Sequence, residues 1–254
     1  MLLVRRGFMT LTNDLAALAI IPGVVIILYV YGKDKVEKEP IRLIIKLIIF
    51  GILSCFAAGT LEQIANNFLP QYPQGSLGYA LINAFALAAF WEEIVKYTAL
   101  RIGSWKDPSF NYRFDGVVYG VSAAVGFAIY ENIMYVAMYG FQTAVVRAFM
   151  AVPLHAFCGV FMGVFYSYSK KASILGNKSA QTSYTILSLV VPMLIHGVYD
   201  TFAFLQSQTA QTALLVFVVL LYIAAVSTIK KLSAADYRSG FYPQARVIDY
   251  DVDL

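Results

Sequence analysis

The sequence predicts an all-α membrane protein, a polytopic bundle of about seven transmembrane helices. Of its 254 residues, 59% are hydrophobic and only 13% are charged, which is unlike soluble domains. Several apolar runs reach the roughly 20 residues that a helix needs to cross a bilayer. Loops that contain Lys or Arg alternate with loops that contain neither. We therefore expect a multi-pass protein of the cell membrane, in particular a prokaryotic plasma membrane.

The apolar runs are separated by segments that contain Pro, Gly or several charges. The first run is too long for a signal peptide and no small-residue cleavage site follows it, so we expect a retained helix. Arg5 and Arg6 precede it, and a start at Met9 would remove both. In chain order, the predicted spans are Asp14–Tyr31, Ile41–Ile64, Leu77–Leu100, Phe114–Tyr139, Ala144–Tyr168, Ser183–Leu205 and Gln211–Ile229.

The loop charges predict the orientation of the chain. Basic residues mark the first, third and fifth loops and follow the last span, whereas the second, fourth and sixth loops have none. The positive-inside rule then places the N-terminus outside and the C-terminus in the cytoplasm. We expect one transmembrane domain over residues 1–232, with a motif-bearing core at about 77–205, and a short polar cytoplasmic tail over 233–254. The net charge of +4 gives no reason to expect a nucleic-acid partner.

Six ionisable residues within the apolar spans are the candidate site. An ionisable side chain at membrane depth costs several kcal/mol, so each one is a functional candidate. The two histidines are the only ones in the chain, which makes their position inside spans informative. The six residues are Glu92, Glu93, Glu131, His155, His196 and Asp200.

Helical geometry gives expectations for the carboxylates of the third span. Glu92 and Glu93 are neighbours, about 100° apart around a helix, so we expect their side chains to diverge rather than face one target. Lys96 lies one turn later and can pair with either. The simplest alternative to a functional role is an ion pair near the helix end, where Lys96 would extend to the interface.

The remaining candidates have their own alternatives. Glu131 could simply pair with Arg147. His196 and Asp200 share one helix face, so the aspartate can orient the imidazole, or both can meet one metal ion or water. A rise of about 1.5 Å per residue places the histidines near the midplane, with Glu131 on one side and Glu92 on the other. The six residues therefore converge only if the third and fourth helices tilt, break or begin later than drawn.

The ordered motifs resemble the PrsW family of intramembrane proteases, which is related to the CAAX prenyl endopeptidases and the bacteriocin-processing membrane proteases. The resemblance covers Trp91 to Asp200 and rests on four motifs: Glu92-Glu93-x-x-Lys96, Phe127-x-x-x-Glu131-Asn132, Pro153-x-His155-Ala156 and His196-x-x-Tyr199-Asp200. It implies an endopeptidase that cuts membrane-anchored proteins, for example an anti-sigma factor at an extracytoplasmic site.

The resemblance also implies residue roles. Glu92 would activate the water, and His196 with Asp200 would occupy a position associated with transition-state stabilisation in the CAAX branch. Glu131 stands where that branch has a histidine. Two routes follow. In the slightly favoured one, Glu131, His155 and His196, with Asp200 as an optional fourth ligand, hold a divalent metal such as zinc, and Glu92 takes a proton from its water.

In the metal-free route, Glu92 activates water directly and the histidines donate hydrogen bonds to the oxyanion. A proton- or cation-coupled transporter is the alternative from a different functional class, because buried Glu, His and Asp also form ion pathways. A transporter would move protons with its substrate and would leave peptide bonds intact. The sequence names neither the substrate nor the oligomeric state.

Overall fold

The computed structural model describes residues 13–236, 240 and 241, and within these ranges it contains helices and loops but no strand. Seven stretches are long and apolar enough to cross a membrane, which confirms the predicted fold class. Each predicted span is present and is longer than expected, by one residue in the fourth span and by nine in the fifth and seventh. The seven stretches are Asn13–Lys33, Ile41–Asn66, Leu77–Ser104, Arg113–Tyr139, Phe141–Ile174, Lys178–Phe204 and Gln208–Ala235.

Two of the seven spans are interrupted. The third consists of α3 (Leu77–Leu81), the π-helix η1 (Ile82–Ala89) and α4 (Phe90–Ser104). The fifth consists of α6 (Phe141–Phe149) and α7 (Ala151–Ile174). The other spans are α1 (Asn13–Lys33), α2 (Ile41–Asn66), α5 (Arg113–Tyr139), α8 (Lys178–Phe204) and α9 (Gln208–Ala235).

Local sequence explains the break in the fifth span. Pro153 has no N–H and its ring clashes with the carbonyl four residues earlier, so a helix cannot run through that position undisturbed. α6 accordingly ends at Phe149, and Pro153 lies in the first turn of α7, where proline is tolerated. Gly140 has a φ of +79°, which favours glycine, and it turns the chain from α5 into α6.

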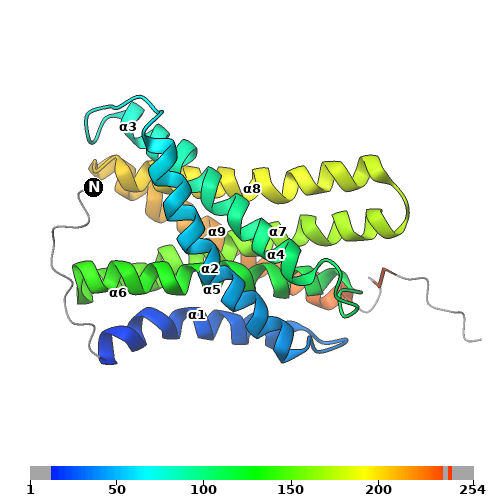
Figure 1. Ribbon diagram of the computed structural model, residues 1–254. Coiled ribbons are helices and arrows are strands. Elements are labelled where there is room, and N and C mark those ends of the chain that lie inside the picture. The colour runs from blue at the N-terminus through cyan, green and yellow to red at the C-terminus, as the bar shows by residue number, and fades with distance from the viewer. Residues whose placement is uncertain (1–12, 237–239, 242–254) are drawn as a thin grey trace, which may run out of the picture.

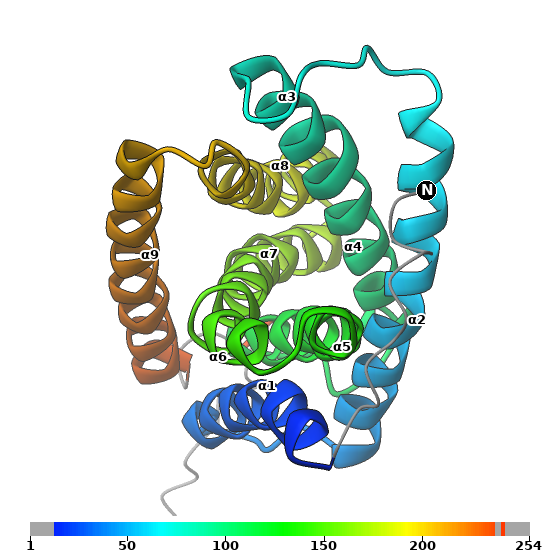
Figure 2. The same cartoon turned by 90° about the vertical axis from the view of Figure 1, so that its left-hand side faces the viewer.

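The helices run between two ends of the bundle (Figure 1). We call the end with the loops 34–40, 105–112 and 175–177 the basic end, because Lys or Arg lies in or beside each of these loops. The opposite, neutral end has the loop 67–76, the turn at Gly140 and the loop 205–207. α1, α5, α7 and α8 run lengthwise, whereas α2, the α3–α4 rod and α9 cross them obliquely (Figures 1 and 2). Which end faces outside stays a prediction.

α5 and α7 form the centre of the bundle (Figure 2). Their spans are largely buried, whereas the other five spans expose most of their residues, as lipid-facing helices do. Glycines allow the two central helices to approach closely. A Cβ on Gly120 would clash with the carbonyl oxygen of Gly159, and one on Gly163 would clash with that of Gly116. The two Gly-x-x-x-Gly motifs thus place α5 against α7.

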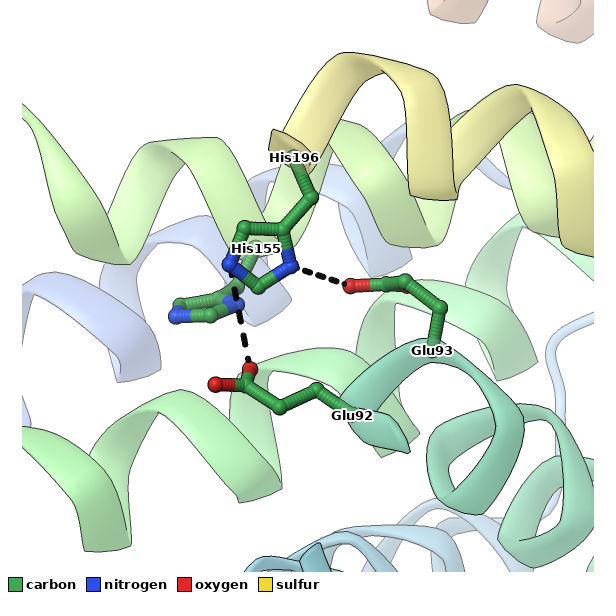
Figure 3. Close-up of side chains that lie close together, drawn as sticks. All are labelled: Glu92, Glu93, His155 and His196. Atoms are coloured by element: carbon green, nitrogen blue, oxygen red, sulfur yellow. Dashed lines mark hydrogen bonds and ion pairs between the residues drawn. The ribbon is translucent and has the colours of Figure 1, made fainter. Parts of the chain in front are cut away.

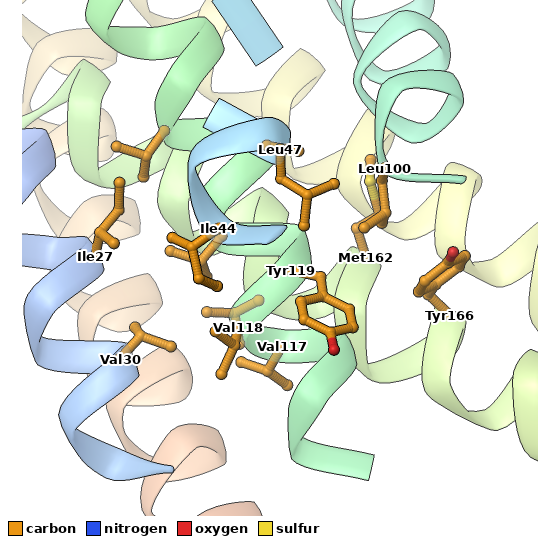
Figure 4. Close-up of a cluster of buried hydrophobic side chains, with 14 of the residues drawn as sticks. Ile27, Val30, Ile44, Leu47, Leu100, Val117, Val118, Tyr119, Met162 and Tyr166 are labelled. Carbon is orange, nitrogen blue, oxygen red and sulfur yellow. The ribbon is translucent and has the colours of Figure 1, made fainter. Parts of the chain in front are cut away.

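A hydrophobic core fills the half of the bundle toward the basic end (Figure 4). Tyr119, Phe110 and Tyr166 are fully buried there, with the rings of Phe110 and Tyr166 stacked 5.1 Å apart. Aliphatic side chains from the first five spans, and Ile229 from α9, complete the cluster. The labelled members in Figure 4 are Ile27, Val30, Ile44, Leu47, Leu100, Val117, Val118, Tyr119, Met162 and Tyr166.

The expected tail is only partly described. Helix α9 continues to Ala235, beyond the predicted boundary at 232. Phe241 is buried, its N–H donates to the carbonyl of Asn111 at 2.8 Å, and its ring lies 5.5 Å from that of Phe110. The chain at Phe241 therefore packs against the loop before α5. Arg5, Arg6 and Met9 and the rest of the tail lie outside the described residues.

Candidate active site

The structure brings the six candidate residues into one cluster. Four spans contribute, and a continuous chain of hydrogen bonds and ion pairs joins the side chains. Glu92 and Glu93 come from α4, Glu131 from α5, His155 from α7, and His196 and Asp200 from α8. Figure 3 shows His196 above the two glutamates, with His155 behind it. The site is thus built where α4, α5, α7 and α8 face one another.

Convergence depends on the departures from straight helices. Straight spans would hold Glu92 and Glu131 at different depths. Instead, the third span crosses the bundle obliquely and contains the π-helix that ends immediately before Phe90 (Figure 1). Such π turns recur at functional sites, because the extra residue per turn re-aims the side chains that follow. The break before α7 also separates the direction of α6 from that of the helix bearing His155.

Lys96 lies at the centre of the cluster. Its Nζ is 3.0 Å from Oε2 of Glu92, 2.9 Å from Oε1 of Glu93 and 2.9 Å from Nδ1 of His155. The expectation that the two glutamates diverge was therefore wrong. Their Cα–Cβ bonds do point apart, but a lysine one turn later lies at i+4 from one and i+3 from the other, within reach of both long side chains. Lys96 is also fully buried and does not extend to the interface.

His155 uses both ring nitrogens. Nδ1 faces Lys96, and Nε2 lies 2.9 Å from Oε2 of Glu131. The same Glu131 oxygen lies 2.6 Å from Nη2 of Arg147, so the suggested Glu131–Arg147 pair is present together with the histidine contact. Nε of Arg147 also donates to Oδ1 of Asn132 at 2.9 Å, and Asn132 donates to the carbonyl of Ala19. Helices α6 and α1 are thereby connected to the site.

His196 is held between carboxylates. Its Nδ1 lies 2.8 Å from Oε1 of Glu93, and its Nε2 lies 3.9 Å from Oε2 of Glu92 (Figure 3). The same Nε2 lies 3.3 Å from Oδ2 of Asp200. Asp200 is one turn later on the same helix face, as its spacing predicts. Each ring nitrogen therefore has a carboxylate oxygen to which it can donate.

Glu92 and Glu93 differ in accessibility. The side chain of Glu93 is 0% exposed and that of Glu92 is 8% exposed. Oε1 of Glu93 contacts both Lys96 and His196, whereas its Oε2 is buried with no hydrogen-bond partner in the described part of the protein. Oε2 of Glu92 contacts Lys96, whereas its Oε1 makes no hydrogen bond to any residue in the described part of the protein. Glu92 is the carboxylate better placed to meet water.

Sequence reasoning missed one acidic residue near the site. Glu62 on α2 is half-buried and close enough for its charge to interact with those of Glu92, Glu131 and His196. It lies inside the predicted span Ile41–Ile64, so the search for ionisable residues in apolar runs could have found it. It lies two residues from the end of that span, where an ionisable side chain costs less than at the centre of the membrane, so its signal is weaker than that of the deeper residues.

The donor types suit a divalent metal ion. Glu92, Glu93, His155 and His196 each offer one ligand atom within 4.8 Å of the others, and imidazole with carboxylate is a set that zinc uses. These buried side chains could therefore bind a metal, although the expected ligand Glu131 is outside this group of four. The arrangement as it stands does not fit an ion, however, because Lys96 already donates to three of the four residues.

Comparison with known proteins identifies the family. Residues 39–226 match the model of the PrsW family of intramembrane metalloproteases. The chain belongs to the PrsW family. Protease PrsW of Bacillus subtilis (strain 168) is 34% identical over 181 residues, which cover 71% of this chain and 78% of that protein. Protease PrsW of Halalkalibacterium halodurans is 29% identical over 223 residues, which cover 88% and 99%.

A third relative, Protease PrsW of Geobacillus kaustophilus (strain HTA426), is 31% identical over 187 residues, which cover 74% of this chain and 78% of that protein. No solved structure matches the chain. As a PrsW family member with seven apolar helices, the protein is a multi-pass intramembrane peptidase whose surroundings include a lipid bilayer and whose substrate is a protein. The resemblance inferred from the four motifs is confirmed.

Proposed function

We propose that this peptidase is an endopeptidase that hydrolyses peptide bonds of membrane-anchored proteins, with Glu92 as the general base. The observation that carries the proposal is the difference between two adjacent glutamates. Glu93 is buried between Lys96 and His196, whereas Glu92 keeps a small exposed area and has one oxygen without a hydrogen bond to any described residue. A base must reach the proton that it takes, within about 3 Å or through one water.

Glu93 and Lys96 are assigned to positioning. Glu93 fixes the orientation of His196 through Nδ1, and Lys96 holds the Glu92 carboxylate through Oε2. A base whose rotamer is locked in this way spends no further entropy on orientation when the substrate arrives. The two glutamates therefore have different roles, although they are neighbours in sequence.

His196 is assigned to the carbonyl oxygen of the scissile bond. Both of its ring nitrogens face carboxylate oxygens, which only accept, so the ring acts as the imidazolium: Nδ1–H donates to Glu93, and Nε2–H is the donor that faces the space between Glu92 and Asp200. A donor aimed at the oxygen where negative charge develops stabilises the tetrahedral intermediate. Asp200 keeps the ring in this orientation, and the proton that Glu92 takes from water can pass to the leaving amine.

The substrate class follows from the position of the site. Because the site is buried in a bundle with lipid-facing helices, we expect the substrate segment to reach it from the membrane or from the nearer end. Glu131, His155 and His196 lie in the halves of their helices nearer the neutral end. If the neutral end faces outside, as the loop charges predict, cleavage takes place on the extracytoplasmic side. A single-pass anti-sigma factor, suggested by the family resemblance, is the first candidate substrate.

The test is cleavage in proteoliposomes of a single-pass reporter with a labelled extracytoplasmic segment. The wild type should release the label, and Glu92→Gln should not. Glu37→Gln, the same change in an exposed loop residue, is the matched control and should cleave normally. If no reporter is ever cut, but substrate addition moves protons across the liposome membrane and Glu92→Gln stops that movement, the protein is a transporter and the proposal fails.

A further inference from the structure

We infer that the Lys96 ammonium is the resident cation of this site and occupies the place that a divalent metal would need, so that the chain works without a bound metal. The second half of this inference rests on the proposed peptidase function, and the first half does not. The family is described as metalloproteases. The side chains of this chain, in contrast, favour a site whose cation is the lysine itself.

The contacts of Lys96 account for all of its hydrogen-bonding capacity. A lysine ammonium has three N–H donors and no acceptor. Its three acceptors are Glu92, Glu93 and His155, at 3.0, 2.9 and 2.9 Å. On its remaining side, Nζ lies 4.1 Å from the centre of the Phe127 ring, within the range of a cation–π interaction. The surrounding side chains therefore form a cation site, and the cation that occupies it is the ammonium group of the chain's own lysine.

Lys96 also determines which nitrogen of His155 carries a proton. Because an ammonium can only donate, Nδ1 of His155 must be the acceptor in that contact. The proton of the neutral ring is then on Nε2, from which it is donated to Glu131 at 2.9 Å. Neither nitrogen is left for a metal. A metal ion would have to displace Lys96 from Nδ1 or Glu131 from Nε2.

Neither ring nitrogen of His196 is available to bind a metal either. Nδ1 is engaged by Glu93, and Nε2 faces Asp200 and Glu92. A metal ion bound by Glu92, Glu93, His155 and His196 would also lie beside the Lys96 ammonium, which contacts three of these four side chains. Two cations at such short range repel strongly in a low-dielectric site. Lys96 and a divalent ion therefore compete for the same donors. As it acts through Glu92 and His155, Lys96 is a positioning residue.

The first test is the metal content of the full-length protein, purified without chelator, incubated with zinc and then desalted. We expect the wild type to retain little zinc. Lys96→Met removes the ammonium and leaves the four donors, so it should bind zinc at least about tenfold more tightly. Lys96→Arg keeps a cation there and should remain zinc-poor. Lys46→Met is the matched control, because Lys46 donates to the carbonyl of Gly103 outside the site.

The second test uses the two histidines as probes. Because His155 and His196 are the only histidines in the chain, a ¹⁵N NMR spectrum of protein with ¹⁵N-labelled histidine contains signals from only two imidazole rings. His155 should show the neutral form protonated on Nε2, and Lys96→Met should change that signature while Lys46→Met does not. Where the reporter is cut, cleavage by the wild type should persist in a strong chelator.

The inference would be overturned if the wild type contained near-stoichiometric metal and the NMR spectrum showed that a histidine nitrogen binds it. This holds whether or not any substrate is cut. A wild-type protein that loses cleavage in chelator and regains it with zinc would overturn the inference as well. If Lys96→Met fails to fold, the wild-type metal content and His155 signature still decide. A metal-poor protein that cuts nothing would instead count against the proposed peptidase mechanism alone.

Discussion

Nζ of Lys96 lies 2.9 Å from Nδ1 of His155, although 59 residues separate the two in the chain. This contact joins α4 to α7, and the Nε2 contact of the same ring joins α7 to α5 through Glu131. The site is thus a set of helices held together by its own polar side chains. Changes to these side chains should therefore affect both cleavage and stability, and the two effects can be separated.

Glu92 and Glu93 should give different phenotypes. Glu92→Gln is expected to lower kcat by about 10²- to 10⁴-fold, the usual contribution of a general base, with little change in KM. Glu93→Gln should cause the larger loss of stability, because this fully buried carboxylate faces both Lys96 and His196. Single-turnover cleavage and thermal unfolding in detergent measure the two effects. Equal kinetics for the two variants would remove the distinction between base and positioning residue.

Arg147 and Glu131 offer a double-mutant test. Arg147→Met leaves the Glu131 carboxylate without its ion-pair partner in a nearly buried position, where such losses cost about 3–5 kcal/mol when burial is complete. The side chains are 14% and 18% exposed, so we expect a cost toward the lower limit.

Adding Glu131→Met should restore stability, because no unpaired charge remains. It should not restore cleavage, because Nε2 of His155 then has no acceptor. Unfolding midpoints in denaturant and cleavage rates for the two single variants and the double variant complete the cycle. A double variant as unstable as Arg147→Met would show that the pair is not coupled.

The contact between α5 and α7 should be sensitive to a single methyl group. Gly120→Ala places a Cβ against the carbonyl oxygen of Gly159 and should cost about 1–3 kcal/mol as overpacking. Gly59→Ala is the matched control: it is also mid-helix, with nothing within 4 Å of the added atom, and it should be neutral or slightly stabilising. Thermal unfolding reports both. Gly120→Ala should also slow cleavage, since Glu131 and His155 lie on the separated helices.

The loop between α1 and α2 should make stability depend on pH. Burial raises the pKa of Glu39 to about 7 and, together with the charge of Asp236, that of Asp34 to about 6. Glu39 meets the Tyr119 hydroxyl and the Asp115 carboxyl, and the charges of Asp34 and Glu37 are nearby. An acid whose pKa is higher in the folded state lowers stability as it ionises.

For Glu39 this cost is absent below its ordinary pKa of 4.5 and complete above about 7. Stability should therefore fall as the pH rises from 5 to 8. Glu39→Gln cannot ionise but keeps hydrogen-bonding groups, so it should unfold at a higher temperature than the wild type at pH 8 and at nearly the same temperature at pH 5. Parallel melting curves for the two proteins across this window would refute the assignment.

Orientation can be tested by cysteine labelling, after Cys55 and Cys158 are replaced. Single cysteines at Gln74 and Gln208, in the neutral-end loop and at the start of α9, should react with an impermeant reagent in intact cells. Cysteines at Lys106 and Lys178, at the basic end, should react only after permeabilisation. The reverse pattern would place the basic end outside and move the proposed cleavage side with it.

The fold could be predicted because its signals are local. Apolar runs of membrane length, bounded by loops of alternating charge, predicted all seven spans, with their ends within six residues of those observed and their lengths underestimated. Pro153, which weakens a helix one turn earlier, accounts for the break between α6 and α7. The π-helix over Ile82–Ala89 could not be predicted, because its residues have the same apolar composition as an α-helical span.

The candidate site was only partly accessible to sequence reasoning. Ionisable residues in apolar runs identified Glu92, His155 and the other four, because burying a charge requires a reason. Their mutual contacts depend on how four helices cross, which no local pattern records. The divergence expected for Glu92 and Glu93 considered only the direction of the Cα–Cβ bonds. It neglected the length of the side chains and the lysine that both can reach.

The contrast between the two central helices and the lipid-facing ones has a consequence for attempts to retarget the enzyme. α5 and α7 touch backbone to backbone at Gly120 and Gly159, so neither can accept bulkier residues there. α2 has open space at Gly59, and it carries Glu62 near the site. Substitutions meant to change the surroundings of the site should therefore be tolerated better at Glu62 on α2 than at the glycine contact between α5 and α7.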